Sequence, residues 1–128
     1  MNIWVNGCFD ILHIGHVRML KFAKSLGDKL IVGIDTDSRV RKAKGHTRPY
    51  NHIDDRVEML RSLWFIDDVV IFDTNDELCD YLEEFQINTM VVGSDWKGKK
   101  IVGGNLVPRI EYFDRINGYS TTAILENK

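Results

Sequence analysis

The 128-residue chain lacks a strong net charge, a long apolar run and a rich supply of cysteine. Its net charge is −2 and its pI is near 6.1, so no overall positive field attracts nucleic acid or an anionic membrane. Any anion must therefore be held by a local site. No apolar run reaches the length of a membrane span and no stretch resembles a signal peptide, so we expect no membrane partner. Two distant cysteines, Cys8 and Cys79, are typical of reduced thiols in a cytoplasmic protein.

The chain also contains no internal repeat, low-complexity tract or linker. Hydrophobic residues make up 44% and charged residues 28%, which is the balance of a globular protein rather than a disordered one. The length suits one core, so we predict a single domain over residues 1–128.

Short apolar or β-branched runs recur along the chain and predict five strands. Each is bounded by Gly, Asp or Asn, which is typical of a parallel sheet buried on both faces. The predicted strands are residues 3–7, 30–34, 68–72, 89–93 and 109–113.

Helical patterns fill most of the gaps between these strands. Apolar residues recur at helical spacing over 17–26, with Gly27 as the expected C-cap, and over 51–64, with Asn51 as the expected N-cap. Further helices are predicted over 75–85 and 119–126. The alternation predicts an α/β fold, a three-layer Rossmann-like sandwich with a central parallel sheet of about five strands.

In such sheets, ligands bind beyond the carboxyl ends of the strands, where the strand order reverses. The loop after the first strand, "NGCFDILHIGH", brings His13 and His16 to a helix N-terminus, where backbone N–H groups and the helix dipole favour an anion. Gly15 lets the backbone approach a ligand, and the spacing of three places both imidazoles on one side. Two alternatives are a purely structural role for the pair and a zinc site with Cys8, which would need a fourth ligand.

The segment after the fifth strand, "RINGYSTT", combines Arg115, Gly118 and the hydroxyls of Ser120 and Thr121 at another expected helix start. It predicts a second phosphate cradle, although a helix N-cap explains the hydroxyls nearly as well. The loop "GSDWKGKK" (93–100) approaches a phosphate-binding GxxxxGK[ST] loop, but Lys100 replaces its hydroxyl residue. The dinucleotide fingerprint GxGxxG is absent.

Together, "GCFDILHIGH" resembles the HxGH signature of the cytidylyltransferase-type nucleotidyltransferases, and "RINGYSTT" is similar to their second signature, Arg-Thr-Glu-Gly-Ile-Ser-Thr-Thr. The resemblance covers essentially the whole chain. It implies that a nucleoside triphosphate and a phosphorylated alcohol or sugar react to an NDP-alcohol and pyrophosphate, with Mg²⁺ as cofactor. The attacking phosphate oxygen is already ionised, so the enzyme needs no strong base. It must bring two anions together and stabilise the charge that develops on the α-phosphate and on the departing pyrophosphate.

The resemblance also implies roles for individual residues. His13 and His16 would stabilise the transition state, and Asp10 would hold the loop. Lys44, from a mobile loop, would reach the α-phosphate and the acceptor, with Lys42 as a weaker candidate. The remaining implied contacts are Gly7, Cys8, Phe9, Gly15, Asp95, Arg115, Ser120 and Thr121 for the nucleotide, with Arg115 also catalytic, and Arg56 and Trp96 for the acceptor. No side chain is predicted to bind a metal.

The sequence indicates the substrate less clearly than it indicates the family. "GSDWKGK" resembles the "GDDWEGK" of glycerol-3-phosphate cytidylyltransferases, and Arg115 also favours CTP, whereas Cys8 departs from their threonine. "NGCFDILH", "KGHTRPYN" and "IVGG" are similar to the adenylyltransferase of ADP-heptose synthesis. We therefore predict CMP transfer to a glycerol 3-phosphate-like polyol, with AMP transfer from ATP to a heptose 1-phosphate as the alternative. A homodimer is expected, with Trp64 and Phe65 either at its interface or in the core. An idle nucleotide-binding module and a metal-binding regulator are the competing classes.

Overall fold

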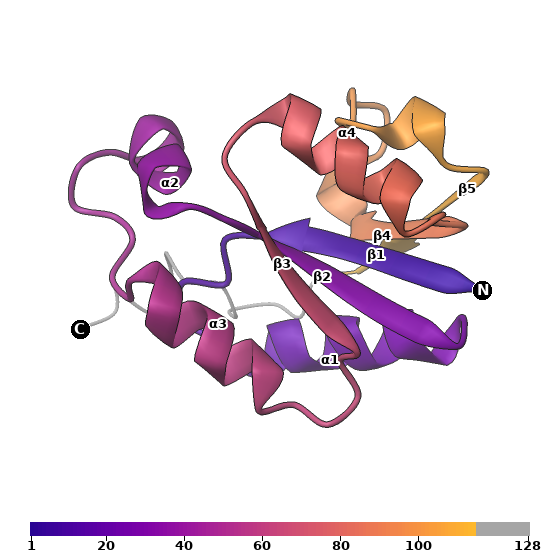
Figure 1. Ribbon diagram of the computed structural model, residues 1–128, viewed down its shortest axis with the longest axis horizontal. Coiled ribbons are helices and arrows are strands. Elements are labelled where there is room, and N and C mark those ends of the chain that lie inside the picture. Colours follow the sequence, from indigo (N-terminus) through magenta and orange to yellow (C-terminus); the bar gives the residue numbers. More distant parts are fainter. Residues whose placement is uncertain (115–128) are drawn as a thin grey trace.

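The computed structural model describes residues 1–114, in which five parallel strands form one sheet (Figure 1). The sheet order is β3-β2-β1-β4-β5, and every neighbouring pair is parallel. All five predicted strands are confirmed, as is the Rossmann-like α/β class. They are β1 (Asn2–Gly7), β2 (Lys29–Asp35), β3 (Asp68–Phe72), β4 (Thr89–Gly93) and β5 (Arg109–Phe113).

Four α-helices and two short 3₁₀ helices connect the strands within this part of the chain. They are α1 (Ile14–Ser25), α2 (Asp37–Lys44), α3 (Ile53–Arg61), α4 (Asn75–Glu84), η1 (Ser94–Trp96) and η2 (Gly104–Leu106). Helix α2 was not predicted. The helix predicted over 119–126 lies outside the described residues, and no described helix is long and apolar enough to cross a membrane.

Two predicted helix caps were wrong. Leu26 rather than Gly27 is the C-cap of α1, and Gly27 instead permits a close approach, since a Cβ there would lie 2.6 Å from the carbonyl oxygen of Met1. His52 rather than Asn51 is the N-cap of α3, because the Asn51 side chain donates its amide to the carbonyl of Asp10.

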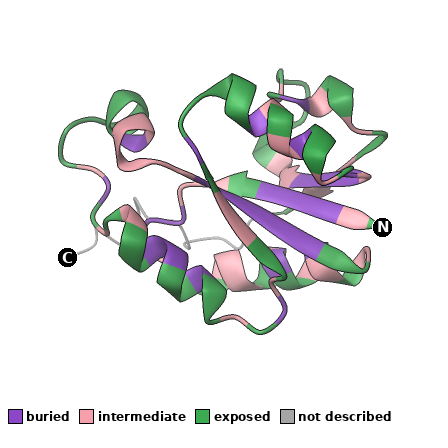
Figure 2. Cartoon of the chain, viewed as in Figure 1, coloured by how far each residue is buried: buried purple, intermediate pink, exposed green. Residues whose placement is uncertain are grey.

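The core has one layer on each face of the sheet (Figure 2). Figure 1 shows α1 and α3 on one face and α4 on the other. Side chains alternate along a strand, so Ile3 and Val5 of β1 pack on the α1 face while Trp4 packs on the α4 face. Of the aromatic pair left open above, Phe65 is 3% exposed and belongs to the core, whereas Trp64 is 87% exposed.

The strand order reverses at β1, whose neighbours are β2 and β4. The connections that leave β1 and β4 therefore diverge, and the carboxyl ends of these strands are where a ligand is expected.

Candidate active site

A cavity of about 730 Å³ opens at these carboxyl ends, within the size range of small-molecule sites. The loops after β1 and β4 both contribute to it, as predicted. Asp10 and Arg56 do not line it, and Arg115, Ser120 and Thr121 lie outside the described residues. The predicted residues that line the cavity are Gly7, Cys8, Phe9, His13, Gly15, His16, Lys44, Asp95 and Trp96.

The histidine pair builds the N-terminus of α1. His13 is the N-cap, and its Nδ1 accepts a hydrogen bond from the N–H of Gly15 at 3.1 Å. The Nδ1 of His16 accepts from the N–H of His13 at 3.3 Å. The two rings stack with centroids 3.8 Å apart and an interplanar angle of 23°. This is a reciprocal capping box in which imidazoles replace the usual hydroxyl and carboxylate.

The capping bonds also orient the imidazole protons. Because each Nδ1 accepts a hydrogen bond, the proton of a neutral imidazole is on Nε2 in both rings. Two N–H donors are thus held side by side beside the positive end of α1, in the cavity wall. The same rings therefore cap the helix through Nδ1 and keep Nε2 as a donor.

The loop between β1 and α1 has an unusual backbone at Phe9, whose φ is +50°. A left-handed conformation costs an L-residue about 1–2 kcal/mol. The Phe9 ring is buried and meets His16 edge-on at 5.2 Å. A Cβ on Gly7 would lie 3.2 Å from this ring, so the glycine leaves room for it. Packing of Phe9 therefore supports the backbone that carries the histidines.

Asp10 fastens this loop to the segment before α3. Its side chain is 1% exposed and accepts hydrogen bonds from the N–H groups of Tyr50 (2.8 Å) and Asn51 (2.7 Å) and from Nε of Arg48 (3.0 Å). Burial alone would raise the pKa of Asp10, but these three bonds outweigh it and lower the pKa below its usual value. The carboxylate is therefore a structural anion behind the cavity wall.

Arg56 occupies a different place from the one predicted. Its side chain is 0% exposed, and it donates to the carbonyls of Cys8 (2.9 Å), Asp35 (2.8 Å) and Asn51 (3.0 Å) and to the Asp37 carboxylate (2.6 Å). These partners belong to the segments after β1 and β2 and before α3. The structure thus corrects the predicted contact with the acceptor: the guanidinium faces the protein, and it positions the loops.

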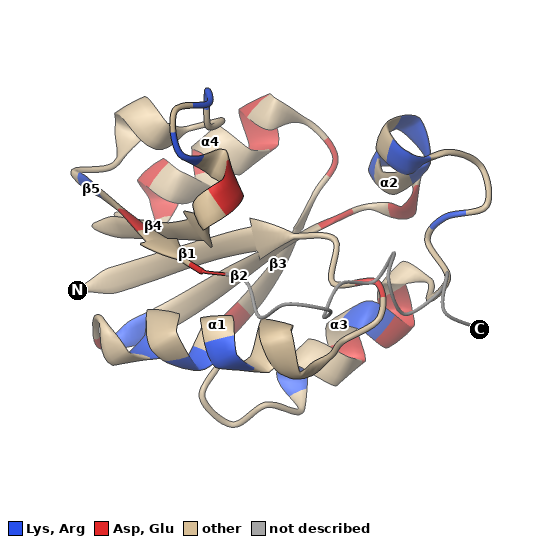
Figure 3. Ribbon diagram, turned by 180° about the vertical axis from the view of Figure 1, so that it is seen from behind, with Lys and Arg blue, Asp and Glu red and all other residues tan. Residues whose placement is uncertain are grey.

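Lys44 is the last residue of α2 rather than part of a loop, and it lines the cavity. Thr36 caps the start of α2, and Val40 is the residue of this helix that is buried against the protein. Figure 3 shows Lys and Arg gathered on this helix, yet Lys42, the weaker candidate, does not line the cavity. The tertiary structure therefore distinguishes Lys44 from Lys42, which the sequence alone could not.

The cavity wall also includes Asn6, Asp35 and Arg39, which were not predicted. Asn6 and Asp35 stand at the carboxyl ends of β1 and β2, where a polar residue after a buried strand could have been noticed. Burial raises the pKa of Asp35, and the positive charge and hydrogen bond of Arg39 oppose that rise.

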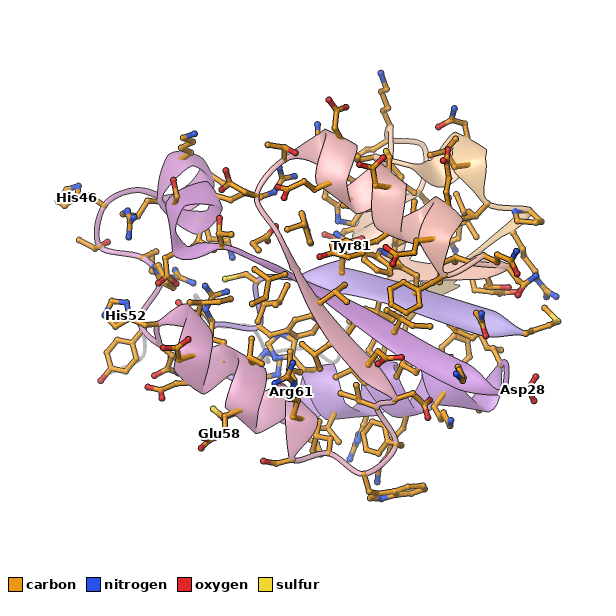
Figure 4. The ribbon with its side chains drawn as sticks, in the orientation of Figure 1. Asp28, His46, His52, Glu58, Arg61 and Tyr81 are labelled. Carbon is orange, nitrogen blue, oxygen red and sulfur yellow. The ribbon has the colours of Figure 1, made fainter. Side chains whose placement is uncertain are left out.

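The described residues contain no group of three or more His, Cys, Asp or Glu side chains that could hold a metal ion. Among these residues, the histidine pair and Cys8 are not grouped as the zinc site considered above would require. Burial raises the pKa of the Cys8 thiol more strongly than the charges of Lys44 and Arg56 lower it, which favours the protonated thiol. The other two histidines, His46 and His52, lie exposed near α2 and α3 (Figure 4).

A parallel α/β sheet with imidazole donors at the N-terminus of the first helix, and a lysine in the wall of the same cavity, is an arrangement suited to binding the phosphates of a nucleotide. The chain belongs to the cytidylyltransferase-like family, whose model matches residues 4–127.

Curated relatives and a solved structure are similar to this chain. It is 44% identical over 124 residues to the bifunctional protein HldE of Campylobacter concisus and of Nitratiruptor sp.. These matches cover 97% of this chain but only 26% and 27% of the relatives, so the chain spans about a quarter of their length. The lipopolysaccharide core biosynthesis protein from Thermoplasma volcanium has a crystal structure similar to this one, with a TM-score of 0.71 and 26% identity, over 94% of this chain and 98% of that one.

Proposed function

We propose that this chain transfers AMP from ATP to a heptose 1-phosphate, releasing pyrophosphate and forming an ADP-sugar. The observation that carries the proposal is the 44% identity to the HldE proteins over nearly the whole chain. It favours the alternative stated above over CMP transfer to a glycerol 3-phosphate-like polyol. The segments "NGCFDILH" and "KGHTRPYN" point the same way, and the first of them lines the cavity in part.

The geometry supports this chemistry without a general base. The acceptor's phosphate oxygen is ionised near neutral pH and attacks the α-phosphate of the nucleotide, and the bond to pyrophosphate breaks. The Nε2–H groups of His13 and His16 and the N-terminus of α1 would stabilise charge on the phosphates. Lys44, which lines the same cavity, would add a positive charge and hold the two anions together.

Magnesium is the cofactor that we propose for the bound nucleotide. Mg²⁺ usually binds through one or two carboxylates together with substrate phosphates and waters. The cavity wall fits that pattern, because it carries carboxylates but no closed ligand set within residues 1–114. Asp95 of η1 would be the protein ligand. The ion would neutralise phosphate charge.

A second candidate, CMP transfer to a glycerol 3-phosphate-like polyol, has one observation in its favour. The segment "GSDWKGK" forms η1 and places Asp95 and Trp96 in the cavity wall, as expected for a loop that contacts substrates. Arg115, the other residue that favoured CTP, lies outside the described residues. Homodimer formation and a cytoplasmic location stay predictions.

Pyrophosphate release with Mg²⁺ tests the proposal, using ATP or CTP crossed with heptose 1-phosphate or glycerol 3-phosphate. We expect release with ATP and heptose 1-phosphate. Release with CTP and glycerol 3-phosphate alone would replace the proposal by the second candidate. No release in any of the four mixtures would contradict both. The His16→Ala protein serves as the control for contaminating activity.

A further inference from the structure

Asn6 is a polar residue at the end of an otherwise buried strand. The three residues before it, Ile3 to Val5, are 0–1% exposed, whereas Asn6 is exposed and lines the cavity. Alternation along β1 places its side chain on the same face as Trp4, the α4 face. The histidines follow β1 on α1, which covers the opposite face. The cavity therefore has a second wall, on the α4 face of the sheet, whereas the imidazoles lie on the α1 face.

The side chain of Asn6 is held in one orientation by Trp4. The indole Nε1–H donates to Oδ1 of Asn6 at 2.9 Å. The indole itself has no freedom to turn, since it is 0% exposed, stacks on Tyr81 at 6.3 Å and lies where a Cβ on Gly33 would be only 2.4 Å from its ring. Because the indole is a donor only, the amide oxygen must face it. The NH₂ group of Asn6 is then directed away from Trp4, as a pair of donors for a ligand.

Asp35 provides the complementary acceptor on the next strand. Its Oδ1 accepts from Nε of Arg39 at 2.9 Å, and within the described residues this hydrogen bond leaves Oδ2 as an acceptor. Arg39 is fixed in turn by the Asp73 carbonyl (3.2 Å) and by Oδ1 of Asn75 (2.8 Å). The guanidinium thus holds the carboxylate in place.

Asn6 and Asp35 lie close enough to bind one small molecule. Asn6 pairs with Gly33 in the β1–β2 register, and Asp35 follows Gly33 by two residues on the same face. Strand spacing and rise place their Cα atoms about 8 Å apart. Sugar hydroxyls both donate and accept hydrogen bonds, so an amide NH₂ group beside a carboxylate suits two neighbouring hydroxyls. A phosphate would be repelled by Asp35 and attracted to Lys44 and the imidazoles.

We propose that Asn6 and Asp35 form the subsite that recognises the hydroxyl groups of the acceptor sugar, on the α4 face of the cavity, while its phosphate points towards Lys44 and the histidines. Trp96 and Ile101, which also line the cavity, would pack against the carbon skeleton. This inference rests on the proposed function, since it names the residues that select the acceptor.

Two isosteric variants test the subsite. Asn6→Asp keeps an acceptor for the Trp4 indole but removes the two donors, and Asp35→Asn keeps a carbonyl for Arg39 but removes the charge. In the pyrophosphate assay we expect each to raise KM for heptose 1-phosphate by about 10- to 100-fold and to change KM for ATP by less than about twofold. Asp68→Asn, exposed at the amino end of β3, is the matched control and should alter neither value. An increase confined to KM for ATP, or equal in both substrates, would overturn the inference.

Trp4→Phe provides an independent check, because it retains most of the ring but removes the indole N–H that orients Asn6. We expect a rise of about threefold to tenfold in KM for heptose 1-phosphate alone. A protein whose two KM values are both unchanged would show that the orientation of Asn6 does not matter, and would contradict the argument from Trp4.

Calorimetric titration separates failure of the inference from failure of the proposed function. If the unaltered protein binds heptose 1-phosphate but does not turn it over with ATP, the proposed function fails. The subsite is still supported if Asn6→Asp weakens that binding at least tenfold and leaves the binding of inorganic phosphate unchanged. If the unaltered protein does not bind heptose 1-phosphate, or binds it as tightly as Asn6→Asp does, the inference is overturned.

Discussion

The two faces of the sheet contribute different chemistry to one cavity. On the α1 face, His13 and His16 come from one short motif, and the backbone of α1 orients them. On the α4 face, Asn6 and Asp35 come from two different strands, and each is oriented by a side chain from elsewhere, Trp4 of the core and Arg39 of α2. The first wall presents the imidazole N–H donors. The second wall combines the amide donors of Asn6, the carboxylate acceptor of Asp35 and apolar surface.

Under the proposed function, this difference separates the reaction from the selection of the acceptor. A wall built from one contiguous motif holds its geometry through local backbone bonds, which suits the step that all substrates share. A wall assembled from distant segments changes whenever any one of them changes, which suits discrimination between acceptors.

The largest expected effect is on the α1 face. His16→Ala removes one of two donors directed at the phosphates, and we expect kcat to fall by about 10²–10³-fold, as for loss of one preorganised donor. KM for the acceptor should change less than kcat, because only the phosphate of that substrate faces the histidines and its hydroxyls are bound on the other face. Circular dichroism and thermal unfolding are the controls for folding. If kcat stayed within about threefold of the unaltered value, the histidines would have only their capping role.

Arg56 tests whether the two walls depend on one buried support. Arg56→Lys keeps the charge but loses the planar fork that reaches the carbonyls of Cys8 and Asp35. We expect the free energy of unfolding to fall by about 3 kcal/mol, because buried carbonyls and the Asp37 carboxylate lose partners. Denaturant unfolding measures this. Both KM values should rise in the folded protein. Unchanged stability would mean that Lys satisfies the same carbonyls.

Lys44 and Lys42 form a matched pair on α2. Lys44→Ala should lower kcat/KM by about 10- to 100-fold, the effect of losing a charged contact, since Lys44 lines the cavity. Lys42→Ala should change it by less than about twofold. Steady-state kinetics at low and high salt would distinguish them, and equal losses in both variants would indicate a general effect of positive charge on α2.

The smallest expected effect concerns Asp10, which holds the α1 wall from behind. Its pKa is lowered in the folded protein, so the ionised carboxylate adds stability above its unfolded pKa of about 3.9, and this contribution is lost as the pH falls through the folded pKa. Asp10→Asn should therefore reduce the free energy of unfolding by about 1–2 kcal/mol at pH 7. The difference should shrink below about pH 4. Urea titrations at both pH values provide the measurement, and a difference that grew in acid would reverse the assignment.

Sequence patterns predicted the parts of this protein that depend on near neighbours. Short apolar runs predicted all five strands, and the spacing of His13 and His16 at a helix start predicted a shared orientation that the structure confirms. Patterns failed where a side chain is used by a distant segment. Asn51 was expected to cap α3 but donates to Asp10 instead, and Arg56 was expected in the cavity but binds carbonyls behind it.

What the sequence determined by itself is the fold class, the position of the histidine pair at a helix start and the family, because periodicity and contiguous motifs are local properties of a chain. Only the tertiary structure decided which lysine reaches the cavity, which charged side chains are structural, and that Trp4 orients Asn6 beside Asp35. The physical reason is that hydrogen bonds and burial join residues far apart in sequence. Such residues acquire a role only when the parallel strands bring their carboxyl ends to one edge of the sheet.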